Sequence, residues 1–221
     1  MAFVSNRKKT SQIKVGNVPV GDFAPISVQS MTTTPTADVD ATVSQIKRLE
    51  NAGCEIVRVA VPDHEAAEAI RAIKKEILIP LIADIHFDYR LAIAATRAGA
   101  DALRINPGNI GSAAKVRAVV ECAADAGISI RIGVNSGSLE KNILKKYSGV
   151  TAEAMVESAL GHIELLNSFG FHQIKVSLKA SDVPRTVDSY RLLSAKTDLP
   201  LHVGVTEAGS LYTGIVKSAL G

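Results

Sequence analysis

The feature that most constrains the fold of this chain is a regular alternation of short apolar runs with helix-like patterns. Each apolar run is rich in Ile, Val or Leu and is bounded by Gly, Pro or Asp, as a buried strand would be. The predicted strands cover residues 25–31, 55–61, 80–87, 101–106, 128–135, 173–179 and 200–206. Such alternation is typical of repeated βα units that build a parallel sheet.

The segments between these runs carry apolar residues at helical spacing and recognisable helix ends. Helices are predicted over residues 38–51, from 63 onward, 89–97, 112–126, 151–169, 184–195 and from about 209 onward. Four of them stop at a glycine, which accepts the left-handed backbone that ends a helix; these are Gly53, Gly99, Gly127 and Gly170. Residues 13–20, with Gly16-Asn17 inside, predict a small hairpin, and 136–149 predict a long loop.

These repeats predict an α/β fold of the TIM (β/α)₈ barrel type, truncated to seven βα units with the eighth missing. An open doubly wound sheet is the alternative, but it usually carries a Gly-rich turn after its first strand. The turn Ser30-Met-Thr-Thr-Thr34 is not Gly-rich. We expect a tail and hairpin over residues 1–24 and an incomplete barrel domain over 25–221. The open edges are expected to be unstable or to pair with another chain.

Composition excludes several classes of function. The 221 residues are 47% apolar and 21% charged, with a net charge of +3, no Trp and no apolar run long enough to span a membrane. We therefore predict a globular protein with neither a membrane nor a nucleic-acid partner. Cys54 and Cys122 lie far apart and lack metal-ligand spacing, so both are interpreted as small core residues of a reduced, cytoplasmic protein.

Polar side chains interrupt six of the predicted strands at alternate positions. Neighbouring side chains of a strand point to opposite faces, so these residues share the face opposite the apolar one. In a barrel that face lines the interior. The candidates are Arg58, Asp84, His86, Arg104, Asn106, Arg131, Asn135, Lys175, Ser177, Lys179 and His202.

The charges on this face are mainly positive. Five basic residues stand against Asp84 and Glu207, and guanidinium groups match phosphate in two-pronged geometry. A lone strand arginine can simply pair with a carboxylate, but basic residues on four strands lack matching acids. The pattern predicts an anion site, with more than one phosphate, at the carboxyl ends of the strands.

The sequence is consistent with more than one role for the acidic residues Glu207 and Asp84. Glu207, after the last predicted strand, is consistent with an acid or base in catalysis and equally with a salt bridge to an interior arginine. Asp84 and His86 are consistent with an orienting pair, whereas two ligands alone do not make a metal site. His64, His162 and His172 are predicted to be surface or packing residues.

The strand ends resemble a known family along almost the whole chain, in order. The shared motifs are Ser27-Val-Gln-Ser-Met-Thr32, Arg58-Val-Ala-Val-Pro62, Ala83-Asp-Ile-His-Phe87, Leu103-Arg-Ile-Asn-Pro-Gly-Asn109, Ile130-Arg-Ile-Gly-Val-Asn-Ser-Gly-Ser138, Lys175-Val-Ser-Leu-Lys179 and His202-Val-Gly-Val-Thr-Glu-Ala-Gly209. In these motifs the chain resembles the 4-hydroxy-3-methylbut-2-enyl diphosphate synthases, which act in the non-mevalonate route to isoprenoids.

The resemblance implies an iron–sulfur oxidoreductase whose barrel binds 2-C-methyl-D-erythritol 2,4-cyclodiphosphate. In this family a separate C-terminal domain holds a 4Fe-4S cluster on three cysteines and a glutamate. The cluster opens the cyclic diphosphate reductively and removes a hydroxyl, with electrons from flavodoxin or ferredoxin. The resemblance also implies a homodimer, and a cytoplasmic or plastid-stroma location. We expect no cluster and no metal in this chain, which would be inactive alone.

The resemblance also implies roles for single residues. Arg58, Arg104, Arg131 and Lys175 would hold the diphosphate, and Glu207 would be the catalytic proton donor. The remaining substrate-binding residues would line the site; they are Asp84, His86, Asn106, Asn135, Ser177 and His202. Two other readings stay open: an aldolase-like barrel that uses Lys175 as a Schiff-base nucleophile, and a non-catalytic module that binds a phosphorylated metabolite.

Overall fold

The computed structural model of the chain describes residues 7–206 and 208–220. Its main sheet is parallel and follows chain order, and each strand is hydrogen-bonded to the next. The strands in this sheet are β3 (Gln29–Met31), β4 (Ile56–Ala60), β5 (Leu81–Asp84), β6 (Ala102–Ile105), β7 (Ser129–Asn135) and β8 (Ile174–Lys179). The predicted TIM-barrel class is confirmed, as a six-stranded open barrel among the described residues.

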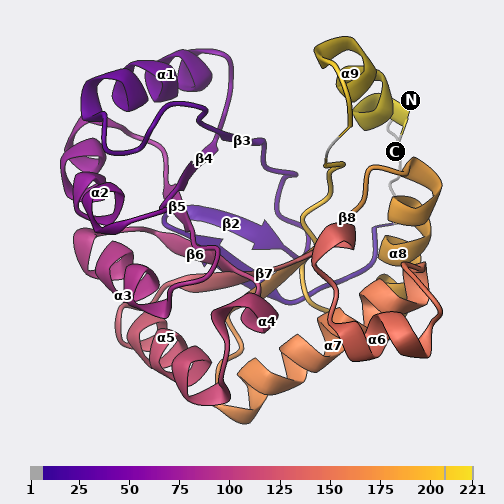
Figure 1. Cartoon of the computed structure of the whole chain (residues 1–221). Coiled ribbons are helices and arrows are strands. Elements are labelled where there is room, and N and C mark those ends of the chain that lie inside the picture. The colour runs from indigo at the N-terminus through magenta and orange to yellow at the C-terminus, as the bar shows by residue number, and fades with distance from the viewer. Residues whose placement is uncertain (1–6, 207, 221) are drawn as a thin grey trace.

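Helices form an outer layer around the strands (Figure 1). They are α1 (Val39–Asn51), α2 (His64–Glu76), α3 (Tyr89–Ala98), α5 (Ala113–Asp125), α7 (Ala152–Ser168) and α8 (Val183–Lys196). Side chains at Asp38, Asp63, Asp88, Thr151 and Asp182 accept a backbone N–H in the first turn of the helix that each precedes. The four predicted glycine stops all have positive φ, between 66° and 104°.

The apolar core lies between the sheet and this outer layer. Every second residue of the strands points outward to it, as the alternation predicts; Val57, Leu103, Ile132 and Val176 are all fully buried there. The helices contribute residues such as Ile46, Ile70 and Leu166, which are also fully buried, to the same cluster. The other face of the sheet is therefore left for the barrel interior.

The N-terminal end of the barrel is covered by the predicted hairpin. Its strands β1 (Gln12–Val15) and β2 (Val18–Gly21) are antiparallel, with Gly16 in the turn at φ 55°. Val15 packs on inward-facing Ile56 and Ile82. The backbone oxygen of Lys14 accepts a 2.8 Å hydrogen bond from Ser129 Oγ at the start of β7. This plug leaves the carboxyl ends of the strands as the accessible mouth of the barrel.

Several predicted boundaries were wrong. The first strand is shorter than 25–31, and the third ends at Asp84, so His86 lies in the following loop. The segment 200–206 is not a strand: it makes one parallel bridge, between Leu201 and Val176. Only β8 flanks it in the described part of the chain, so the barrel stays open between this segment and β3.

The connections at the mouth are more structured than predicted. The turn after β6 forms a single helical turn, α4 (Pro107–Ile110), because the side chain of Asn106 caps it. The predicted loop 136–149 contains a 3₁₀ turn (Ser136–Ser138) and a short helix, α6 (Lys141–Lys146). The last helix, α9 (Leu211–Leu220), stands apart from the outer layer in Figure 1. None of the helices in the described ranges has both the length and the apolar character needed to cross a membrane.

Candidate anion-binding site in the barrel interior

Four charged residues lie side by side across the inner face of the sheet. The strand register places Asp84 opposite Arg104, Arg104 opposite Arg131, and Arg131 opposite Lys175. We call these four residues the charged row. All four are buried, with exposed fractions of 9% or less. Like charges directly opposite each other destabilise a sheet, so the row is a costly arrangement that folding alone does not explain.

The carboxylate of Asp84 is the acid of the charged row, and three basic groups share it. Arg104 Nη1 donates to Oδ1 at 3.0 Å, Arg58 Nε lies 3.4 Å from Oδ2, and His86 Nε2 lies 3.7 Å from Oδ1. Burial would raise the pKa of Asp84, but the nearby imidazole of His86 and the charges of Arg104 and Arg58 lower it far below its usual range. One carboxylate therefore balances only part of the positive charge.

Several guanidinium N–H groups in the row have no acceptor among the described protein atoms. They are the Nε of Arg104 and the Nε and Nη1 of Arg131. Burial, followed by the nearby charges of Arg58 and Arg104, lowers the pKa of Arg131 to about 9. A buried donor without a partner is costly. An anionic ligand bound next to these groups would provide the acceptors that they lack.

One further cation lies closer to the mouth. In the first inward row beyond the charged row Gly133 is opposite Ser177, and in the next row Asn135 is opposite Lys179. Burial, followed by the charge of Arg131, lowers the pKa of both Lys175 and Lys179 to about 7. A bound anion would raise the pKa of both lysines, because a neighbouring negative charge favours their protonated form.

Gly133 makes room for Arg104. A Cβ atom at this position would lie 2.4 Å from Arg104 Nε and 2.9 Å from Nη2. The guanidinium therefore lies directly against the β7 backbone, where only a glycine allows it. This close approach holds the free Nε of Arg104 beside Arg131 in the barrel interior.

The remaining predicted residues surround this centre. Asn106 and Asn135 lie at the carboxyl ends of β6 and β7, and Asn106 Nδ2 donates to Ser138 Oγ at 3.3 Å. The side chain of His86 is 55% exposed, and burial and neighbouring cations lower the pKa of His202 beyond β8. Ser177 is buried in the row above the charged row. The expected catalytic Glu207 lies outside the described residues.

Two features of the site were not predicted from the sequence: the contact of Met31 with Arg58, and Lys179 as a member of the ligand-binding set. Arg58 Nε and Nη2 donate to the thioether Sδ of Met31, at 3.2 and 2.9 Å. No charge or spacing pattern marks Met31, because methionine is ordinarily read as core. Lys179 was counted in the interior charge but not included among the substrate-binding residues, although its position two residues after Ser177 puts it on the inner face.

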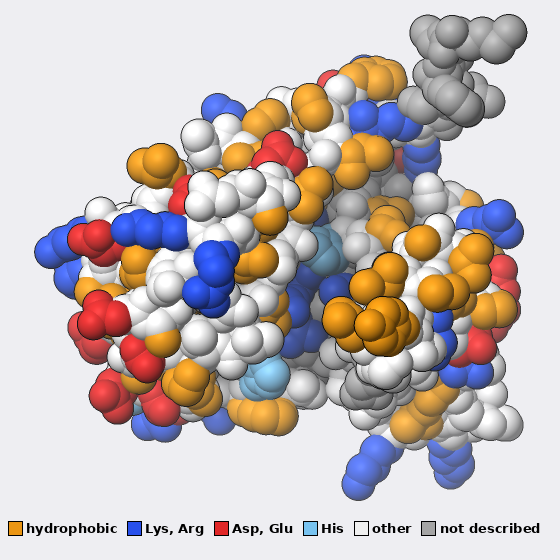
Figure 2. All heavy atoms as spheres, turned by 90° about the horizontal axis from the view of Figure 1, so that it is seen from above, with side chains coloured by type: hydrophobic (Ala, Val, Ile, Leu, Met, Phe, Trp, Pro, Cys, Tyr) orange, Lys and Arg blue, Asp and Glu red, His pale blue; other side chains and the backbone are white. Residues whose placement is uncertain are grey.

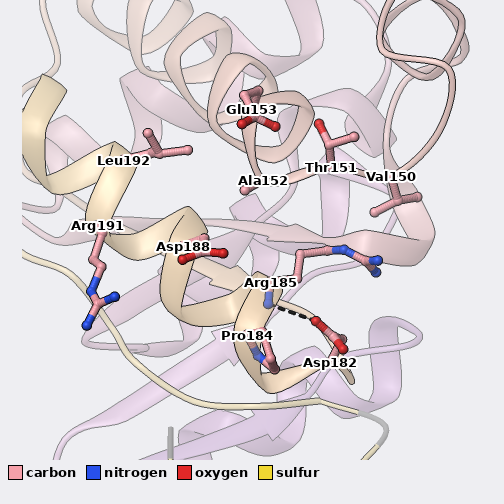
Figure 3. A pocket seen from close by; sticks show the side chains of 10 residues that line it. All are labelled: Val150, Thr151, Ala152, Glu153, Asp182, Pro184, Arg185, Asp188, Arg191 and Leu192. Atoms are coloured by element: carbon pink, nitrogen blue, oxygen red, sulfur yellow. Dashed lines mark hydrogen bonds between the residues drawn. The ribbon is translucent and has the colours of Figure 1, made fainter.

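The surface view shows basic side chains in a hollow. Seen from above, Lys, Arg and His side chains gather between two bulkier parts of the surface (Figure 2). A separate groove of about 570 Å³ lies outside the barrel, between the starts of α7 and α8 (Figure 3). Its charged side chains have both signs, Glu153, Asp182 and Asp188 against Arg185 and Arg191. The barrel interior, not this groove, has the excess positive charge that an anion needs.

Comparisons with known proteins agree with this architecture. The profile of a family described as the GcpE TIM-barrel domain matches residues 10–221. The chain is 59% identical over 218 residues to the 4-hydroxy-3-methylbut-2-en-1-yl diphosphate synthase (flavodoxin) of Caldanaerobacter subterraneus subsp. tengcongensis, covering 99% of this chain and 61% of the relative. It is 60% identical over 215 residues to the protein of the same name from Geobacter sulfurreducens, covering 97% and 61%.

Solved structures support the fold alone. Dihydropteroate synthase from Yersinia pestis superposes with a TM-score of 0.64 at 13% identity, covering 95% of this chain and 85% of that one. 3-Dehydroquinate dehydratase from Geobacillus kaustophilus superposes with a TM-score of 0.62 at 14% identity, covering 93% and 81%. At such low identity, these likenesses say nothing about which ligand the interior takes.

Proposed function

The chain belongs to the GcpE family, and we propose that it is the substrate-binding barrel of a 4-hydroxy-3-methylbut-2-enyl diphosphate synthase. The reaction proposed for the whole protein is the reductive ring opening and dehydroxylation of 2-C-methyl-D-erythritol 2,4-cyclodiphosphate in non-mevalonate isoprenoid synthesis. The chain spans about three fifths of the length of the relatives it matches. Its own contribution would be to bind and orient the cyclic diphosphate.

The observation that carries this proposal is the charged row with its unpartnered donors. A cyclic diphosphate has two phosphates in one small ring, and Arg104 and Arg131 offer buried N–H donors side by side. Lys175 and Lys179 would supply further positive charge to the second phosphate. Asp84 would fix the orientations of Arg104 and Arg58 and stay ionised while it does so.

The polar groups at the mouth would bind the carbon skeleton. Asn106 and Asn135 present amides next to the cations, and amides can both donate to and accept from the hydroxyls of a sugar-derived substrate. His86, His202 and Ser177 would complete the lining. Glu207 stays a prediction as proton donor, because it lies outside the described residues.

The family's 4Fe-4S cluster would supply the two electrons, but the described residues do not fit it. Cys54 precedes β4 and donates to the backbone oxygen of Ile56, and Cys122 lies on the outer helix α5. Among the described residues, no three His, Cys, Asp or Glu side chains form a metal-binding group. We infer that the cluster belongs to another part of the enzyme. Flavodoxin is the proposed electron donor, with ferredoxin as the alternative, in a homodimer.

Calorimetric titration with the cyclic diphosphate tests this proposal. The intact chain should bind it, and Arg104→Ala should weaken binding by about thirtyfold or more, because the substitution removes a buried charged donor. Arg117→Ala is the matched control: it removes the same charge from the exposed face of α5 and should leave affinity unchanged. Absence of binding by the intact chain, or equal affinity in the Arg104 variant, would contradict the assignment.

One observation favours a second function. Lys175 is 2% exposed and its pKa is lowered to about 7 by burial, which are the conditions that make a lysine a Schiff-base nucleophile. An aldolase-like reaction would then use this side chain. Borohydride reduction in the presence of a carbonyl substrate should trap a covalent adduct on Lys175, and a chain without any adduct would rule this function out.

A further inference from the structure

The segment between β7 and α7 lies beside the mouth of the barrel. It begins with the 3₁₀ turn Ser136–Ser138, continues through α6 and ends at Gly149. Ser138 Oγ accepts a hydrogen bond from Asn106 Nδ2 at 3.3 Å and donates to the backbone oxygen of Asn135 at 3.2 Å. One serine of this segment therefore contacts both asparagines of the candidate site.

A partly buried contact between a carboxylate and a histidine ties this segment to α7. Glu140 Oε1 lies 2.9 Å from Nε2 of His162, and the His162 residue is 8% exposed. The hydrogen bond from His162 lowers the pKa of Glu140 to about 2, so the carboxylate is ionised under ordinary conditions. Its second oxygen, Oε2, is buried without a partner among the described residues. His162, which the sequence predicts to be a surface or packing residue, is packed and contacts a carboxylate.

The same pair lies next to Gly108, in the turn that follows Asn106. A Cβ atom on Gly108 would meet Glu140 Oε1 at 3.2 Å, Asn106 Oδ1 at 3.4 Å and His162 Cε1 at 3.4 Å. The N–H of Gly108 donates to Asn106 Oδ1 at 3.1 Å. Glu140 and His162 therefore lie close to the Cα of Gly108, in the turn that follows Asn106, where an added methyl group would touch both.

These residues do not form a nucleophilic triad. Ser158 Oγ lies 3.5 Å from Nε2 of His162, which is the same ring nitrogen that Glu140 approaches. In a triad the nucleophile and the carboxylate use opposite nitrogens of the imidazole. Ser158 and His162 are also buried. A positional role fits the geometry better than a chemical one.

We propose that Glu140 and His162 are positioning residues that hold the β7–α7 segment against the Asn106 turn and so fix Asn106 at the mouth of the barrel. Ser138 extends this effect to both asparagines, because it accepts from the side chain of Asn106 and donates to the backbone oxygen of Asn135. The effect on ligand binding rests on the proposed function, whereas the effect on the turn does not. Loss of the pair would release Asn106 while leaving the charged row in place.

A second anchor of the same segment provides the control. Lys146 Nζ and Tyr147 Oη both contact Glu157 Oε2, at 2.5 and 2.7 Å. This anchor also joins α6 to α7, but it is more exposed than the Glu140–His162 pair, with side-chain exposures of 60% for Lys146 and 38% for Glu157. Glu157→Ala removes from α7 the carboxylate that the far end of the segment contacts, and it should leave the Asn106 turn undisturbed.

Amide hydrogen exchange in the ligand-free chain tests the proposal without any ligand. The N–H of Gly108 reports directly on Asn106, its acceptor. In Glu140→Ala this amide should exchange about tenfold faster, the effect of losing one charged hydrogen bond, while core amides such as Ile132 keep their protection. Glu140→Gln, which can still accept from the imidazole, should restore most of the protection. In Glu157→Ala the Gly108 amide should exchange at the rate of the unmodified chain.

Ligand titration of the same variants distinguishes a failure of the positioning role from a failure of the proposed function. If the intact chain binds the cyclic diphosphate, Glu140→Ala should weaken binding by about tenfold and Glu157→Ala should not. Unchanged exchange at Gly108, equal loss of protection across the core, or unchanged affinity in Glu140→Ala would overturn the positioning role. Failure of the intact chain to bind would instead count against the proposed function, and the exchange result would still decide the role of the pair.

Discussion

Strand β8 and the segment 200–206 have the same sequence pattern but different structures. Both alternate apolar with polar residues, yet β8 pairs with β7 at six positions, whereas the later segment makes one bridge. Val176 and Leu178 of β8 are fully buried, while Val203 is 64% exposed. Alternation thus predicts which face a residue takes, but whether a segment forms a strand also depends on the neighbours it pairs with and packs against.

The same difference extends to the helices that follow. Apolar residues of α7 such as Met155 and Leu166 are fully buried against the sheet, whereas Leu211 and Tyr212 of α9 are 74% and 81% exposed. The charged row lies on β5 to β8, four consecutive strands that are hydrogen-bonded in order. Buried unpaired charge therefore coincides with the region whose packing is strong enough to hold it.

The largest expected contrast is between two truncations, one on each side. Leu178→Ala should lower the free energy of unfolding by about 2–5 kcal/mol, because it empties a fully buried position. Val203→Ala should change it by less than about 0.5 kcal/mol, since its side chain is largely exposed. Urea denaturation of both variants measures the difference. Equal destabilisation would mean that 200–206 is packed as firmly as β8.

A second contrast uses the two inner glycines. Gly133→Ala should cost about 1–3 kcal/mol, because the new methyl group would overlap Arg104. At Gly204 a Cβ atom would meet only Lys179 Cε and Nζ, both at an ordinary 3.5 Å. Gly204→Ala should therefore be close to neutral. Thermal unfolding and ligand titration should both distinguish the two variants. If Gly133→Ala changes neither stability nor affinity, the close approach of Arg104 to the β7 backbone is not required.

A third contrast is in the pH dependence of stability. Burial and neighbouring cations hold the pKa of Lys175 and Lys179 at about 7, against 10.5 in an exposed lysine. Between these values the unfolded chain binds more protons than the folded one, so the stability of the ligand-free chain should rise with pH from about 7 to about 10. The thermal midpoint of unfolding should rise over the same pH interval.

Two variants isolate this pH effect. Lys175→Met should flatten the rise, since it removes one of the two interior lysines. Lys217→Met, on α9 outside the barrel, should keep it; Lys217 Nζ donates only to the backbone oxygen of Ser181 among the described hydrogen bonds. Identical pH profiles in the Lys175 variant and the unmodified chain would show that Lys175 is not desolvated as the fold implies.

Much of the fold could be predicted because its signals are local. Helix caps such as Asp63 and Thr151, stops such as Gly99, and the outward apolar face of β7 all follow from neighbouring residues. The failure of 200–206 to form a strand could not be predicted, because it depends on which segments flank it in space. α6 was missed because its six residues are too few for a periodic signal.

The candidate site shows the same limit. Inward-facing Arg58, Arg104, Arg131 and Lys175 follow from alternation along each strand. Their order across the sheet follows from register, which the sequence of one strand does not specify. Contacts between side chains far apart in the chain were also beyond reach; the thioether of Met31 on Arg58 and the Glu140–His162 pair are examples.

The central claim is that the charged row binds a diphosphate, and a crystal structure of the chain with the cyclic diphosphate tests it most directly. Phosphate oxygens should lie within about 3.2 Å of the donors that now lack acceptors, Arg104 Nε and Arg131 Nε and Nη1. Phosphates bound instead in the outer groove between α7 and α8, with these donors still unpaired, would contradict the account.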